Sequence, residues 1–172
     1  FYAACGMEPT LVEDVMLHDL AATVPARALP AGYRVELWSD AAQAAFYTAY
    51  SDSFRERPGF PGWSLAHWLA GMADSPTLRT DLSRVVLTAD GRPVGFVVCD
   101  EERCEGLLRG WIVQVGVVPD QRGQGLADWL INMALRQWQA EGAVGVLLTV
   151  NANNPRARRV YERLGFLAIG QR

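Results

Sequence analysis

A six-residue segment in the second half of the sequence, Arg122-Gly123-Gln124-Gly125-Leu126-Ala127, has the composition of an anion-binding loop. Its two glycines let a ligand approach the backbone closely. If a helix starts at the end of this segment, its first N–H groups lack partners within the helix and its dipole favours negative charge there. Phosphate is a common occupant of such a site, although a turn that serves only tight packing gives the same pattern.

The residues on either side of this loop predict the strand and the helix that position it. Val113, Val115 and Val117 alternate along a β-rich run, and Pro119 has no N–H with which to continue a strand. Downstream, apolar residues recur at helical spacing as far as residue 140. The sequence therefore predicts a strand, the glycine loop and a helix in direct succession.

A second block, residues 148–166, reads Leu-Thr-Val-Asn-Ala-Asn-Asn-Pro-Arg-Ala-Arg-Arg-Val-Tyr-Glu-Arg-Leu-Gly-Phe. Asn154 precedes a proline and can cap a helix that carries Tyr161. Together the two blocks resemble the GNAT superfamily of acyl-CoA-dependent N-acetyltransferases, whose pyrophosphate loop reads Arg/Gln-x-x-Gly-x-Gly/Ala and is followed later by Asn-x-x-Ala and Tyr-x-x-x-Gly-Phe. The loop has neither the lysine of a Walker sequence nor the third glycine of a dinucleotide fold.

The remaining predicted elements follow the order that this resemblance implies. Strands are predicted at residues 33–37, 83–89, 93–99 and 144–150, and helices after Asp40, at 65–72 behind Ser64, and at 155–164. Asp90-Gly91 indicates a hairpin, and residues 100–109 read as a polar connection. We expect an α/β (α+β) fold in the order β-α-α-β-β-β-α-β-α-β. By resemblance, its mixed, largely antiparallel sheet is flanked by helices and splays open to admit acyl-CoA.

The first 20 residues read as part of another copy of the same domain. Residues 1–7 match residues 160–166, a pattern that the resemblance places near the end of a domain. We therefore assign residues 1–20 to the strand-forming tail of a preceding copy, 21–32 to a linker and 33–172 to the acetyltransferase domain. This arrangement is similar to mycothiol synthase and related two-copy acetyltransferases.

The C-terminal end is short for such a domain, because only seven residues follow Gly165. Residues 11–20 have the sequence of the strand that is missing there. We expect this segment to pack beside the strand that starts at Phe166, either in its own chain or in a second chain as a swapped dimer.

The resemblance implies a role for each motif residue, with acetyl-CoA as the donor substrate. Its pantetheine arm is expected along Val115 and Val117, where Gly116 indicates a bulge, close ligand approach or simple packing. Tyr161 aligns with the tyrosine that protonates the departing thiolate, with a purely structural tyrosine as the alternative. Asn154 either contacts the cofactor or serves only as a helix cap. The expected cofactor-binding residues are Val115, Val117, Arg122, Gly123, Gln124, Gly125, Leu126, Ala127 and Asn154.

The general base and the acceptor site are less well defined. Many members carry a glutamate on the strand before the loop, and this sequence has none there, so Glu101, Glu102 and Glu105, acting through water, are the candidates. The acceptor site is expected within residues 54–68. Their aromatic residues, Phe54, Phe60, Trp63 and Trp68, could equally form ordinary core.

Composition narrows the class of protein further. The net charge is −3 and half of the 172 residues are hydrophobic, which favours one globular domain and gives no sign of a nucleic-acid or membrane partner. The three cysteines lack metal-ligand spacing, and we expect no metal and a cytoplasmic location.

These observations predict a transferase that moves an acetyl group from acetyl-CoA to the primary amine of a small molecule. The missing strand glutamate keeps a second possibility open, namely a catalytically silent copy that binds acyl-CoA or supports a neighbouring domain. A homodimer, or packing against a preceding acetyltransferase copy, is compatible with both.

Overall fold

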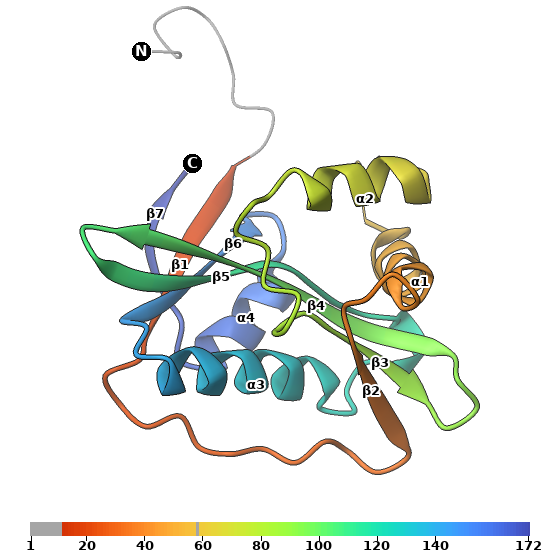
Figure 1. Ribbon diagram of the computed structural model, residues 1–172, viewed down its shortest axis with the longest axis horizontal. Helices are drawn as coiled ribbons and strands as arrows, with labels where there is room; N and C mark the ends of the chain where they lie inside the picture. The colour runs from red at the N-terminus through yellow and green to blue at the C-terminus, as the bar shows by residue number, and fades with distance from the viewer. Residues whose placement is uncertain (1–11, 58) are drawn as a thin grey trace, which may run out of the picture.

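The computed structural model describes residues 12–57 and 59–172, which form one mixed sheet with helices on both faces (Figure 1). The strands are β1 (Glu13–Asp19), β2 (Tyr33–Leu37), β3 (Arg84–Thr88), β4 (Pro93–Cys104), β5 (Leu107–Val117), β6 (Gly145–Asn151) and β7 (Leu167–Gln171). The helices are α1 (Gln43–Phe54), α2 (Leu65–Ala73), α3 (Leu126–Ala140) and α4 (Pro155–Arg163), with a 3₁₀ turn η2 (Pro119–Gln121). The expected fold class is confirmed.

The strand order across the sheet is β2-β3-β4-β5-β6-β1-β7. Its neighbours pair antiparallel except β5 and β6, which are parallel. Parallel neighbours need a crossover connection, and here that connection is the glycine loop followed by α3. The loop therefore lies at the carboxyl end of β5, where a ligand can reach both the loop and the sheet.

The β5–β6 pair splays apart after a short contact. Residues 109–112 of β5 pair with residues 145–148 of β6, and beyond Ile112 no pairing between these two strands continues. β5 runs on to Val117 beside β4, whereas β6 runs on to Asn151 beside β1. One edge of the second half of β5 is thus free of backbone partners within the described residues.

A bulge in β5 lies at the start of this splayed half. Val98 pairs with Gln114 and Cys99 with Ile112, so Val113 has no partner on β4. Gly116 does not lie at this bulge, and the contacts around it agree with packing, one of the alternatives that we considered for it. A Cβ atom there would lie 2.8 Å from the Ser53 Cβ and 2.9 Å from the Phe96 ring, so α1 packs directly on the strand.

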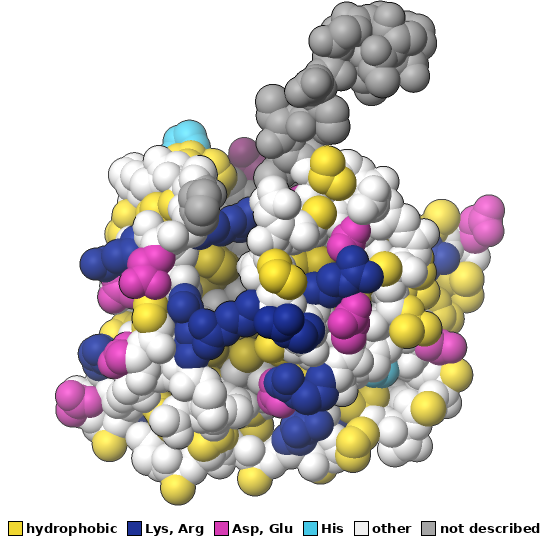
Figure 2. All heavy atoms as spheres, turned by 180° about the vertical axis from the view of Figure 1, so that it is seen from behind, with side chains coloured by type: hydrophobic (Ala, Val, Ile, Leu, Met, Phe, Trp, Pro, Cys, Tyr) yellow, Lys and Arg dark blue, Asp and Glu magenta, His cyan; other side chains and the backbone are white. Residues whose placement is uncertain are grey.

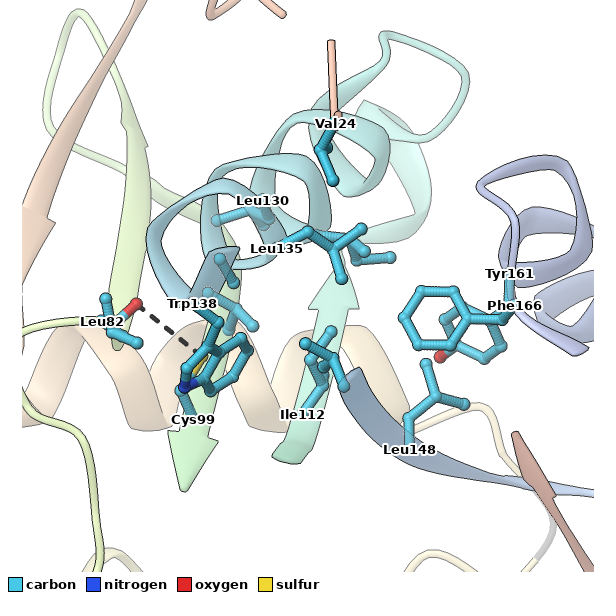
Figure 3. Close-up of a cluster of buried hydrophobic side chains, with 14 of the residues drawn as sticks. Val24, Leu82, Cys99, Ile112, Leu130, Leu135, Trp138, Leu148, Tyr161 and Phe166 are labelled. Atoms are coloured by element: carbon cyan, nitrogen blue, oxygen red, sulfur yellow. Dashed lines mark hydrogen bonds between the residues drawn. The ribbon is translucent and has the colours of Figure 1, made fainter. Parts of the chain in front are cut away.

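The helices pack against the two faces of the sheet through two separate hydrophobic cores. α3 and α4 cover one face of the sheet, where Trp138 lies over Gly110 with no room for a Cβ atom. Figure 3 shows this core, with Trp138 beside Cys99, and Tyr161 and Phe166 beside Leu148. α1 and α2 cover the other face through Phe46, Tyr50 and Trp68. The splayed half of β5 therefore lies between two packed layers that hold it in place.

The strand expected from the N-terminal segment forms in its own chain. β1 is inserted between β6 and β7 and pairs antiparallel with both. Met16 on β1 is fully buried, and the buried Asp14 carboxylate accepts bonds from Arg158 (2.6 Å) and Gln171 (2.9 Å), as a buried charge requires. Leu11 and the repeated residues 1–7 lie outside the described residues.

The segment that joins β1 to β2 packs along α3 as it crosses beneath the sheet (Figure 1). The Val24 N–H donates to the Gln139 side chain (3.0 Å), and the Asn132 side chain donates to the Pro25 carbonyl oxygen (2.9 Å). α3 therefore orders this connection.

Two local expectations were wrong. Residues 100–109 are not a connection, because β4 continues to Cys104 and a tight turn at Glu105 (φ 53°) and Gly106 (φ 81°) leads straight into β5. The charged residues of this segment lie in an exposed hairpin, where strands with polar side chains can still pair through their backbones. Asp40 does not cap α1, whose N-cap is Ala42; its carboxylate instead accepts from the Gln43 side chain. Ser64 does cap α2, accepting from the His67 N–H (3.3 Å).

No helix in the described part of the chain is long and apolar enough to cross a membrane. The same residues contain no group of three or more His, Cys, Asp or Glu side chains placed to hold a metal ion.

Candidate active site

The glycine loop presents an unbroken row of backbone donors. Gly123 and Gly125 both have φ of 81°, a left-handed conformation that costs glycine little. Gly125 is the N-cap of α3 and supplies no side chain to bond the helix N–H groups. Across residues 12–57 and 59–172, no hydrogen bond uses the N–H groups of residues 123–128. Free donors at the positive end of a helix form an anion site that suits a pyrophosphate.

A cleft of about 1330 Å³ starts at this loop and follows the gap between β5 and β6. The expected site residues that line it are Val115, Val117, Arg122, Gly123, Gly125, Leu126, Ala127, Asn154 and Tyr161. Gln124 does not line it, and its side chain is exposed. Residues from the two sequence blocks meet here because β5 leads into the glycine loop and β6 leads into the start of α4. The cleft lies where these two strands diverge.

Four arginines line the cleft, namely Arg57, Arg122, Arg156 and Arg163, whereas its acidic lining residues in the described part of the chain are Glu56 and Asp128. Asp128 is partly neutralised, because Arg163 bonds it at 2.7 Å. Figure 2 shows arginine side chains gathered around hydrophobic side chains near the middle of the face opposite to that of Figure 1. The balance of charge in the cleft favours a polyanionic ligand.

Arg122 lines the cleft, as expected for a cofactor-binding residue, and its side chain also makes contacts within the protein. Its guanidinium donates to the Val117 carbonyl oxygen (3.0 Å) and to the Ser53 carbonyl oxygen (2.9 Å). It thereby ties the end of β5 to the last turn of α1, whose carbonyl groups lack helical partners. We infer that Arg122 positions the walls of the cleft, in addition to contributing charge.

Tyr161 lies at the inner wall of the cleft on α4. It is 9% exposed, and its ring packs edge-on against Phe166 with 6.0 Å between ring centroids. No hydrogen bond to its hydroxyl is present among the described residues. Burial raises the pKa of Tyr161 to about 12, so the phenol stays protonated at neutral pH. A protonated phenol with no other partner suits a proton donor.

The structure separates the roles of the polar residues at the start of α4. The Asn154 side chain accepts from the Ala157 N–H (3.1 Å), so its cap role is observed, and it also lines the cleft. Arg158 is occupied by Asp14 (2.6 Å) and Glu162 (2.8 Å) and does not line the cleft. Arg156 remains on the cleft wall and is available to an anionic ligand.

None of the three candidate bases lines the main cleft. Glu101 is held by Arg79 (2.6 Å), Glu102 lies 3.5 Å from Arg109, and Glu105 occupies the hairpin turn. Glu101 and Glu102 line a separate hollow of about 380 Å³ with Trp111. The free carboxylate of the main cleft is instead on Glu56, for which the described chain shows no arginine partner.

The aromatic residues expected at the acceptor site are divided between core and surface. Trp68 is fully buried and donates from Nε1 to the Gln114 side chain (3.1 Å). Trp63 is 42% exposed, and Phe60 packs against the second core. Only Phe54 lines the cleft. The ordinary-core interpretation thus holds for most of this segment.

Ser53 lines the cleft although the sequence analysis did not select it. Glu56 and Arg57 also line the cleft, and they lie within the range expected for the acceptor site, although neither was singled out there. The three residues lie in the last turn of α1 and just after it, in a stretch with no motif. The signal that could have pointed to them was Gly116, because a glycine in the cleft strand indicates a second backbone packed on it.

Comparison with known proteins agrees with this geometry. The model of the Acetyltransferase (GNAT) family matches residues 35–166, and the chain belongs to that family. The mycothiol acetyltransferase of Corynebacterium diphtheriae is 31% identical over 150 residues, which are 82% of this chain and 49% of that protein. N-alpha-acetyltransferase 30 of Schizosaccharomyces pombe is 37% identical over 87 residues, 50% of this chain and 57% of that protein. The chain thus spans about half the length of these curated relatives.

Solved structures share the fold. The GCN5-related N-acetyltransferase from Sphaerobacter thermophilus has a TM-score of 0.76 at 26% identity, over 95% of this chain and 50% of that one. The NatC complex bound to a Gag peptide and CoA contains a chain with a TM-score of 0.64 at 19% identity, over 80% of this chain and 86% of that chain. The latter likeness is one of fold alone.

Proposed function

We propose that this protein transfers the acetyl group of acetyl-CoA to the primary amine of a small molecule. The observation that supports this most directly is the row of unpaired N–H groups at residues 123–128, which opens into a cleft that also contains Tyr161. The anion site would hold the phosphate end of the cofactor, and the proton donor would lie near its thioester end, with β5 between the two.

The cofactor's pyrophosphate takes the loop N–H groups, with Arg156 close to its negative charge. The pantetheine arm follows the free edge of β5 at Val115 and Val117, where β6 no longer pairs. Amide and carbonyl groups of the arm can then bond the free backbone groups of this edge as another strand would, apart from the Val117 carbonyl oxygen, which accepts from Arg122. The thioester is carried toward the fork of the sheet, beside Tyr161.

The reaction forms a C–N bond and breaks the C–S bond. The neutral amine attacks the thioester carbon, its nitrogen then loses a proton to water or to Glu56 in the open cleft, and Tyr161 gives its proton to the departing thiolate. A proton from solvent then restores the Tyr161 phenol. A buried phenol with a raised pKa keeps that proton until the thiolate develops.

Relatives differ in the acceptors that their names indicate, and coverage favours a small molecule. The match to the mycothiol acetyltransferase of C. diphtheriae extends over 82% of this chain, whereas the match to the N-alpha-acetyltransferase of S. pombe covers 50%. The longer match includes more of the regions outside the cofactor motifs, where the acceptor is bound. We also propose that residues 1–20 are the tail of a preceding copy, because residues 1–7 repeat the sequence pattern of residues 160–166.

The alternative is a copy that binds acyl-CoA without turnover. It is supported by the absence of a carboxylate on the splayed half of β5 and by the exposed position of Glu56. Thiol release from acetyl-CoA, measured with a panel of small primary amines and with peptides bearing free N-termini, separates the possibilities. Thiol release with small amines supports the proposal. Release with peptides alone would mean that the acceptor is a peptide N-terminus. Tight acetyl-CoA binding without thiol release supports the silent copy.

Gly125→Glu tests the anion site itself. The new carboxylate would lie at the loop and oppose phosphate, and we expect calorimetry to show at least a roughly 100-fold loss of acetyl-CoA affinity. Gly106→Glu is the matched control, because Gly106 also has φ of 81° with open space around it, but lies in the β4–β5 hairpin. Equal affinity in both variants would contradict the assignment of the loop.

A further inference from the structure

The described chain contains three buried side-chain polar atoms without a hydrogen-bond partner: His18 Nδ1, Ser53 Oγ and Trp138 Nε1. Leaving such a group unpaired is unfavourable, by roughly 1–3 kcal/mol for a neutral donor or acceptor. His18 and Trp138 belong to packed regions away from the cleft. Ser53 alone among the three lines it.

Ser53 had a local partner available and does not use it. A helical serine or threonine can bond the carbonyl oxygen four residues earlier, as Thr48 does on the same helix with Ala44 (2.9 Å). The equivalent partner for Ser53 is the Ala49 carbonyl oxygen, and that bond is absent from the described chain. The Ser53 hydroxyl is instead turned toward β5, 3.0 Å from the position that a Cβ atom of Gly116 would take.

The surroundings hold Ser53 rigidly in this position. Arg122 bonds its carbonyl oxygen and also the carbonyl oxygen of Val117, so the last turn of α1 is locked onto the end of β5. Gly116 has no side chain, which lets the helix come this close to the strand. The residue is 5% exposed, so bulk water does not surround it. A positioned, desolvated and unpaired hydroxyl calls for a partner, and a ligand in the adjoining cleft can supply one.

We propose that Ser53 Oγ donates a hydrogen bond to a carbonyl oxygen of the bound acyl-pantetheine arm. This inference rests on the proposed function, because it places that arm along the splayed half of β5, at the level of Gly116. The acyl-pantetheine has two kinds of carbonyl group, the thioester and the amides, and both are hydrogen-bond acceptors. The hydroxyl is neutral, so it can bond either without adding charge to the cleft.

Ser53→Ala separates this role from a structural one. The substitution removes an unpaired buried hydroxyl, so we expect the melting temperature to stay the same or rise. We expect kcat/KM for acetyl-CoA to fall by about 10-fold, the usual effect of one lost neutral hydrogen bond. Ser83→Ala is the matched control, because Ser83 is fully buried and its hydroxyl both donates to the Arg79 carbonyl oxygen (2.8 Å) and accepts from the Cys99 N–H (3.0 Å). That variant should lower the melting temperature and leave acetyl-CoA affinity unchanged.

Calorimetry with CoA and with acetyl-CoA identifies the carbonyl group. Loss of affinity for both ligands in Ser53→Ala indicates a pantetheine amide, whereas a loss confined to acetyl-CoA or to turnover indicates the thioester. If Ser53→Ala melts at a lower temperature, or binds and turns over acetyl-CoA as the wild type does, the inference is wrong. If the wild type turns over no amine, the proposed function fails, and the affinity of Ser53→Ala for the two ligands still decides the role of Ser53.

Discussion

Tyr161 combines the properties of a structural and of a chemical residue. Tyr161 belongs to the core that includes Phe166 and also lines the cleft, and its hydroxyl has no hydrogen-bond partner among the described residues. The Tyr161 phenol proton is therefore available for donation to the departing thiolate. The same burial that packs the ring raises the pKa of the phenol, because it disfavours the phenolate.

Tyr161→Phe should lower kcat by roughly 100-fold, the lower end of the usual range for a general acid, with acetyl-CoA affinity unchanged. The ring and its packing are retained, so the melting temperature should change little. Because burial raises the pKa of Tyr161 from its ordinary value of 10.0 to about 12, the phenol remains protonated below pH 10, and its ionisation should not limit turnover there. Steady-state kinetics across this pH range test both statements.

Tyr47→Phe provides the control for that measurement. Its hydroxyl donates to the Trp63 carbonyl oxygen (2.7 Å) and lies outside the lining of the cleft. Loss of this bond should leave kcat unchanged. Equal losses in the two variants would indicate that removal of any tyrosine hydroxyl disturbs the fold, and would contradict the acid role of Tyr161.

At the scale of elements, β1 depends on contacts with the turn that follows α4. The His18 ring on β1 meets Phe166 edge-on with 5.3 Å between centroids, and lies close to Gly165. Burial lowers the pKa of His18 below its ordinary value of 6.5, against the opposing effect of Asp19. The neutral ring is therefore the form that the folded state prefers.

Stability should consequently depend on pH through His18. The stabilising contribution is fully present above pH 6.5 and is lost as pH falls below that value, because the unfolded chain takes up the proton first. Denaturant unfolding on either side of pH 6.5 should show a smaller pH dependence in His18→Gln than in the wild type. His67→Gln, on an exposed position of α2, serves as control and should retain the wild-type dependence.

At the scale of the whole molecule, β1 joins the two ends of the described chain. It is the neighbour of β6 on one side and of β7 on the other, and β7 has no other strand partner among the described residues. Removing β1 therefore removes two strand pairings and exposes the edge of β6. Such an edge invites pairing with another chain.

A chain that starts at Ala21 should aggregate or melt far below the full chain, as light scattering and thermal unfolding can show. A milder test replaces the fully buried Met16 with Ala, which should lower the free energy of unfolding by about 2–5 kcal/mol. Leu167→Ala is the control, because Leu167 is 71% exposed and should cost less than about 0.5 kcal/mol. If the truncated chain is soluble and melts at the wild-type temperature, β1 does not support the sheet.

The sequence by itself determined the features that depend on neighbouring residues. The glycine loop, the start of α3 behind Gly125 and the cap at Asn154 are local, because turn geometry and helix capping involve residues only a few positions apart. The order of strands and helices followed from periodicity in the same way. The hairpin at residues 100–109 was missed because its charged residues conceal a strand that is exposed at its tip.

Only the tertiary structure decided which distant groups meet. Ser53 shares the cleft with Tyr161 because α1 packs on Gly116, and the guanidinium of Arg122 is directed to two carbonyl oxygens by that same contact. The insertion of β1 between β6 and β7, and the separation of Glu101 and Glu102 from the main cleft, likewise depend on long-range pairing. Local pattern carries no information on these contacts, because sequence periodicity shows which face of an element is apolar and not which element will cover it.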